Sequence, residues 1–129
     1  MTVELTYLVW SALLAIVQLL IASAGTLSRV GLDTAVGNRE DMPASLPGWV
    51  GRARRAHVNL LENLVVFAIL VIAAHLADRN NDMTALGALI FFWARLAFVV
   101  AYVLGITWVR SILWFAGFAG MILIALQLI

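Results

Sequence analysis

The chain has 129 residues, of which 64% are hydrophobic and 12% are charged, and its mean hydropathy is +1.04. Soluble domains are about half apolar and about a quarter charged, so a soluble globule is excluded and an integral membrane protein of one domain, residues 1–129, is expected. The formal net charge of +1 gives no reason to expect nucleic-acid binding, and the lack of cysteine excludes thiolate metal sites.

The first predicted membrane span is the uncharged run Leu5 to Ser28, which is long enough to cross the hydrocarbon at roughly 1.5 Å per residue. The segment from residue 28 to residue 49 contains both prolines and several glycines, so it is predicted to be an ordered loop. Pro47-Gly48 marks the end of this loop and the start of the second helix.

The second uncharged run lies between Glu62 and Asp78 and is too short to cross about 30 Å of hydrocarbon. The second helix must therefore begin earlier and carry part of the stretch "GRARRAHVNLLEN" into the membrane. A third span runs from residue 83 to about residue 104 and contains Arg95, and a fourth, uncharged span runs from residue 111 to residue 129. Short links at 79–82 and 104–108 predict an all-α membrane protein, a four-helix antiparallel bundle.

Arginine placement predicts the orientation. One side of the membrane holds six of the eight basic residues: Arg29, Arg39, Arg52, Arg54, Arg55 and Arg110. The positive-inside rule places this side in the cytoplasm and both termini outside. Every basic residue is arginine and none is lysine, which fits a GC-rich genome, so we expect a bacterial inner membrane.

Polar residues follow one face of the second helix, about 100° wide. The predicted stripe consists of Arg52, Arg55, Asn59, Glu62 and Asn63, with Arg54 and His57 directed away from it. A charge inside the membrane costs about 2.5–3.5 kcal/mol and indicates function by default. The alternative is that the arginines extend to lipid headgroups; that explanation does not suit Asn59 and Glu62, which lie deeper.

The third helix presents Arg95, Phe98 and Tyr102 on one face. Arg95 and Glu62 lie at similar depths, so we expect them to form an ion pair that relieves both burial penalties. The alternative is that such a pair only sets the register of the helices. Tyr102 is either an interfacial aromatic residue or a hydroxyl donor to a polar pocket.

Arg110 is expected in the first turn of the fourth helix, with Thr107 as its cap. A cation there opposes the helix dipole, whereas an arginine beside a helix N-terminus suits a bound anion. A membrane anchor is the alternative. Arg55, Asn59 and Tyr102 lie on the same side of the membrane, which favours the anion site.

These motifs resemble those of the MAPEG family, the membrane-associated proteins of eicosanoid and glutathione metabolism. "RRAHVNLLEN", residues 54–63, resembles the helix-two signature of the family and is closest in wording to the microsomal glutathione transferases. "NRED", "ARLAFVVAY" and "VRS" fit the first loop and the third and fourth helices. The resemblance covers nearly the whole chain, although Phe98 stands where some members have a tyrosine that contacts glutathione.

The resemblance implies a homotrimer that binds glutathione as co-substrate between neighbouring subunits, near the cytoplasmic face. It also implies conjugation, peroxide reduction or isomerisation of a lipophilic small molecule, an electrophile, within the lipid. By position, the glutathione-binding residues would be Arg29 (from the neighbour), Arg55, Asn59, Glu62 and Tyr102. Arg110 would be catalytic, because it would stabilise the reactive thiolate. No metal is expected, since the two histidines are far apart in the sequence.

Two other functions stay open at this point. One is a non-catalytic scaffold or lipid-binding subunit that keeps the fold alone. The other is a small four-helix exporter, which is disfavoured because the first helix has no carboxylate within the membrane and Glu4 lies at its edge.

Overall fold

The computed structural model describes all 129 residues and is all-helical. Its helices are α1 (Val3–Val30), α2 (Leu32–Val36), α3 (Gly48–Leu76), α4 (Asp82–Val103) and α5 (Thr107–Leu126). All except α2 are long and apolar enough to cross a membrane. The predicted four-helix membrane fold is confirmed, and the loop between the first two spans also contains the short α2.

The helix boundaries follow local sequence signals. Thr2 caps α1 through its side chain, which accepts a hydrogen bond from the Leu5 backbone N–H at 3.1 Å. α3 begins directly after Pro47, as predicted, and therefore carries the charged stretch within one continuous helix of 29 residues. Asn81 and Thr84 form a reciprocal capping box at the start of α4. Gly105, with φ of +80°, supplies the left-handed turn between α4 and α5.

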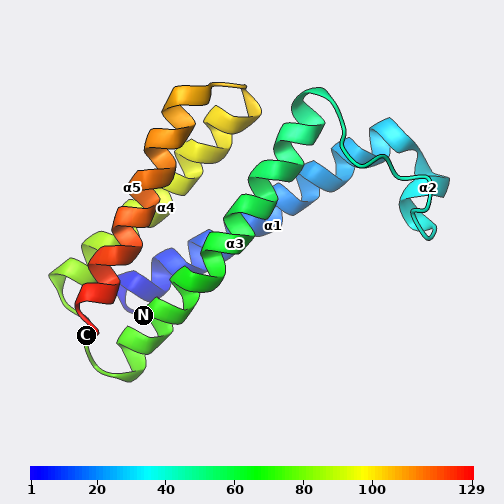
Figure 1. Cartoon of the computed structure of the whole chain (residues 1–129). Helices are drawn as coiled ribbons and strands as arrows, with labels where there is room; N and C mark the ends of the chain where they lie inside the picture. Colours follow the sequence, from blue (N-terminus) through cyan, green and yellow to red (C-terminus); the bar gives the residue numbers. More distant parts are fainter.

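The core lies at the end of the bundle that holds both termini (Figure 1). Phe67 of α3 and Phe91 of α4 stack there with ring centroids 3.9 Å apart, and Met121 and Ile124 of α5 pack in the same cluster. The α4–α5 hairpin and the α1–α3 pair diverge toward the opposite end (Figure 1). The helices thus pack together at the end with the termini and spread apart toward the arginine-rich end.

Two glycines bring α4 and α5 into close contact. A Cβ added at Gly87 would lie 2.5 Å from the carbonyl oxygen of Gly120, and a Cβ added at Gly120 would lie 2.5 Å from that of Gly87. Small residues such as these favour close approach of two helices. Gly120 therefore packs α5 against α4 within the chain.

Large hydrophobic side chains cover the outside of the helices. Leu20, Val65, Ile69 and Ile112 are all more than half exposed. Such a surface is unfavourable in water and suits lipid. The chain is an integral membrane protein.

Candidate functional site

A polar hollow lies on the surface of α3. It has a volume of about 280 Å³ and is lined by Arg54, Arg55, Val58, Asn59 and Glu62. Three of these, Arg55, Asn59 and Glu62, belong to the predicted stripe, and the structure brings them together. Two cations, one carboxylate and one amide at a single site suit a ligand that carries both charges.

Arg52 and Arg54 do not occupy their predicted positions. Arg52 leaves the stripe, and its Nε donates to the Val103 carbonyl oxygen at 2.9 Å, which satisfies a backbone acceptor at the end of α4. Arg54 was expected to point away, but it lines the hollow, and its Nη1 donates to Thr26 Oγ1 of α1 at 3.0 Å. Helical periodicity fixes the direction of Cβ only, and the long arginine side chain reaches across to neighbouring helices.

Arg95 pairs with an amide and not with Glu62. Arg95 is 2% exposed, and its Nη2 donates to Asn59 Oδ1 at 2.7 Å. Its guanidinium carbon lies 4.1 Å from the centroid of the Phe98 ring. Glu62 is exposed on the outer face of α3. The expected Glu62–Arg95 ion pair is therefore not formed within the chain, because Glu62 faces outward and Asn59 faces α4.

The contact with Arg95 orients the Asn59 amide. Asn59 Oδ1 accepts from Arg95, while Asn63 Nδ2 donates to the Asn59 backbone carbonyl at 2.8 Å. With its oxygen occupied by a cation, the Asn59 amide has its Nδ2 left to donate to another group. Arg95 thus reaches the polar hollow indirectly, through Asn59.

A second cluster joins α4 to α5. The Arg110 guanidinium carbon lies 4.6 Å from the centroid of the Tyr102 ring, and the Tyr102 ring packs against Phe98. Arg110 is in the first turn of α5, as predicted, but Thr107 does not cap the helix. Ile106 holds the cap position and no side chain accepts from the first N–H groups, so these donors are free for an anion.

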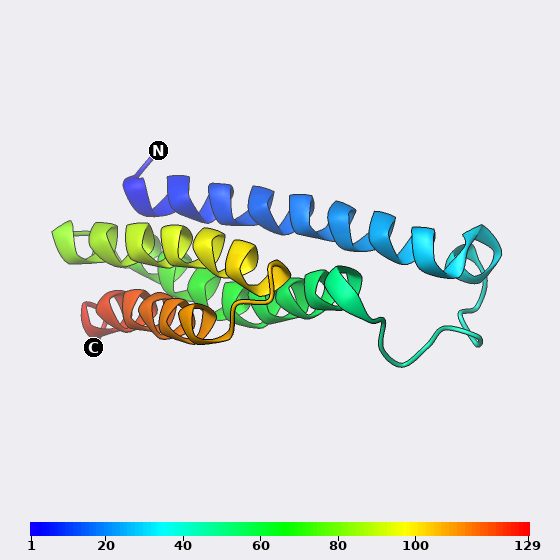
Figure 2. The same ribbon diagram turned by 90° about the horizontal axis from the view of Figure 1, so that it is seen from above.

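Arg29 stands apart from both clusters. It is exposed in the last turn of α1, and α1 continues past the turn between α4 and α5 (Figure 2). Neither Tyr102 nor Arg110 lines the hollow on α3. Within a single chain, the predicted site residues therefore do not all line one hollow: they lie on α1, on α3 and on the α4–α5 hairpin.

The comparison with known families decides the assignment. A family model, that of the MAPEG family, matches residues 7–129. The chain belongs to the MAPEG family. No curated protein and no solved structure matches the chain. As a MAPEG protein with four membrane-spanning helices, the chain is a membrane protein of the family associated with glutathione and eicosanoid metabolism.

Proposed function

We propose that this MAPEG protein is a glutathione-dependent transferase or peroxidase that acts on lipophilic electrophiles in the membrane. The observation that carries the proposal is the hollow on α3, in which Arg54, Arg55, Asn59 and Glu62 meet. Glutathione has two carboxylates, an ammonium group and peptide amides, and this set of side chains complements all of them.

Each side chain has a specific role in the proposal. Arg55 binds a glutathione carboxylate, and Glu62 pairs with the ammonium group. Asn59, oriented by Arg95, donates from Nδ2 to a peptide carbonyl of glutathione. These contacts hold the tripeptide so that its thiol extends toward the α4–α5 turn of the neighbouring subunit.

The catalytic part of the proposal concerns the thiol. A thiol with an ordinary pKa, about 8.5, is mostly protonated at neutral pH and is then a poor nucleophile. Arg110 and the uncapped N-terminus of α5 favour the thiolate, and Tyr102, beneath the Arg110 guanidinium, adds a hydroxyl donor. The thiolate then attacks an electrophile that reaches the site from the lipid.

The site is completed in a homotrimer. The α3 hollow of one subunit faces the Arg110–Tyr102 cluster of its neighbour, and Arg29 reaches the same site at the end of α1. We place the protein in a bacterial inner membrane with the arginine-rich end in the cytoplasm.

Glutathione binding to the detergent-purified protein tests the proposal first. Calorimetry should give millimolar or tighter binding for the wild type and at least tenfold weaker binding for Arg55→Ala, because a charge-assisted hydrogen bond contributes about 1.5–3 kcal/mol. Arg39→Ala is the matched control, because Arg39 lies in the loop outside the hollow. A wild type that binds no glutathione would favour the non-catalytic scaffold.

Thiol titration tests the role of Arg110. The absorbance of the bound thiolate is followed against pH in the wild type and in Arg110→Leu. The variant should titrate at higher pH, lose turnover at pH 7 and recover part of it in alkali, while glutathione affinity changes less because the α3 residues are intact. Identical titration curves would leave Arg110 as a membrane anchor only.

A further inference from the structure

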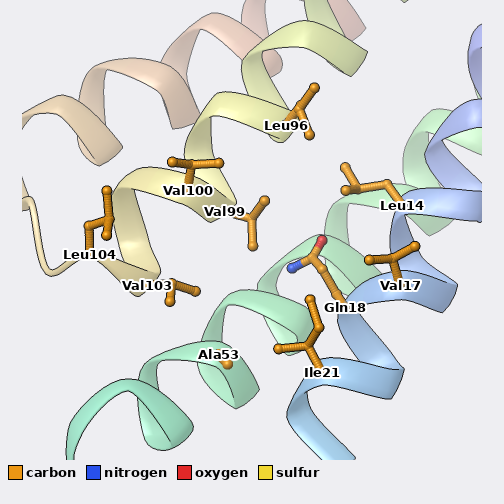
Figure 3. A pocket seen from close by; sticks show the side chains of 10 residues that line it. All are labelled: Leu14, Val17, Gln18, Ile21, Ala53, Leu96, Val99, Val100, Val103 and Leu104. Carbon is orange, nitrogen blue, oxygen red and sulfur yellow. The ribbon is translucent and has the colours of Figure 1, made fainter.

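An apolar cavity of about 340 Å³ lies between α1, α3 and α4, near the arginine-rich end. Nine of its ten lining residues are hydrophobic, and the tenth is Gln18 of α1. Figure 3 shows the last turns of α4 on one side, α1 on the other and Ala53 of α3 between them. The cavity shares no lining residue with the polar hollow on α3.

Gln18 is the unusual residue of this cavity. It is 5% exposed, and neither its Oε1 nor its Nε2 has a hydrogen-bond partner. The other buried polar side chains of α1 are satisfied: Ser11 and Thr26 donate to backbone carbonyls at 2.7 and 2.8 Å, and Glu4 accepts from Thr84. Buried polar groups nearly always have partners, so an amide with neither atom paired indicates a missing one.

The Gln18 amide extends toward α4 but does not open onto the cavity. Figure 3 shows the Gln18 amide extending from α1 toward Val99 and Val103 of α4. The surrounding aliphatic side chains close it off from solvent. The terminal torsion of a glutamine is soft, and turning this amide toward the cavity breaks no hydrogen bond because the amide makes none.

We propose that the cavity binds a long-chain lipid whose head is a neutral hydroxyl. The lining helices are long and apolar enough to cross a membrane, and the lining has no charged residue, so an ionised head is disfavoured. A hydroxyl both donates and accepts, which matches the free Nε2 and Oε1 of Gln18. The volume lies at the lower end of the range for ligand sites, about 300–1,000 Å³, and suits part of one acyl chain.

Photolabelling tests this site directly. The full-length protein in detergent is irradiated with a long-chain alcohol that carries a diazirine, and the labelled peptides are mapped by mass spectrometry. Label should fall on α1 around Gln18 and on the last turns of α4. Unlabelled hexadecanol should compete about fivefold better than hexadecane at equal mole fraction, which is the effect of one neutral hydrogen bond.

Two variants and one control make the test specific. Gln18→Leu should fold, because it replaces an unpaired amide by an apolar side chain, and should abolish the preference for the alcohol over the alkane. Gln127→Leu is the control, since Gln127 lies outside the cavity and bonds Asn81. Val99→Phe narrows the cavity from α4 while Gln18 stays intact, and it should lose the label even if Gln18→Leu proves unstable.

Three results would overturn the proposal. They are labelling away from the cavity, an alcohol preference unchanged by Gln18→Leu, and label that reaches Gln18 only after the oligomer is dissociated, which would identify a neighbouring subunit as the occupant. The labelling needs no glutathione, so the outcome is independent of the proposed enzymatic function.

Discussion

Arg95 is a buried cation whose partners are one neutral amide and one aromatic ring. In lipid each hydrogen bond to such a residue stabilises it, and Asn59 supplies one, whereas the Arg95 Nε has no partner. The hydrogen bond between Asn59 and Arg95 therefore has two effects. It stabilises Arg95 within the subunit, and it fixes the orientation of the Asn59 amide at the polar hollow.

A double-mutant cycle checks the contact between Asn59 and Arg95. Asn59→Leu should destabilise the subunit by about 1.5–3 kcal/mol, because a hydrogen bond to a charged group is lost. Arg95→Leu in the Asn59→Leu background should then cost less than it does alone. Unfolding in mixed detergent micelles without glutathione measures the coupling.

The control cycle pairs Arg95→Leu with Glu62→Gln. Because Glu62 is exposed and does not contact Arg95 within the chain, these changes should be additive within about 0.5 kcal/mol. If Arg95 is coupled more strongly to Glu62 than to Asn59, the two charged residues form an ion pair, which would contradict the structure.

At the level of helices, close approach of α4 and α5 depends on Gly87 and Gly120, whose backbones leave no room for a Cβ. Gly120→Ala should destabilise by about 1–3 kcal/mol through overpacking, although alanine is the better helix former by about 1 kcal/mol. The midpoint of thermal unfolding in detergent measures the difference.

Gly117→Ala is the matched control on the same helix. A Cβ there would meet Arg95 Cδ at 3.4 Å, an ordinary contact, so this variant should be as stable as the wild type or slightly more stable. Equal losses for Gly117→Ala and Gly120→Ala would show that the contact between α4 and α5 is not tight.

The helices were predictable from the sequence because the length of each run without charged residues limits where a membrane-spanning helix can lie. The short run after Glu62 required an earlier start for α3, and α3 does begin at Gly48. The face of α3 that each residue occupies was less predictable. Glu62 and Asn59 are less than one helical turn apart, and both fit the predicted polar stripe. The helix packing around α3 decides which of them meets Arg95, and the sequence does not encode that packing in any local pattern.

The arginines show the same limit. The presence of Arg55 in the polar hollow follows from helical periodicity, whereas Arg52 and Arg54 exchange roles because their side chains reach Val103 and Thr26 on neighbouring helices. The apolar cavity at Gln18 gave no sequence signal at all, because one glutamine in a membrane helix does not reveal whether it has a partner.

At the scale of the whole molecule, one chain carries only part of the active site that the proposed function requires. Neither Arg110 nor Tyr102 lines the hollow on α3, and charged groups exposed on α3 are unfavourable against lipid. We therefore expect native mass spectrometry of the protein released from detergent micelles to give trimers. A spectrum of monomers and dimers only would contradict the shared site.

The most direct test is complementation between two inactive chains. Arg55→Ala and Arg110→Leu are expressed separately and together, and turnover of glutathione with a lipophilic electrophile is measured at pH 7. If each site takes Arg55 from one subunit and Arg110 from the next, random mixing in a symmetric ring should restore about a quarter of the sites to wild-type composition. Activity that stays at the level of the separate variants would contradict a site built between subunits.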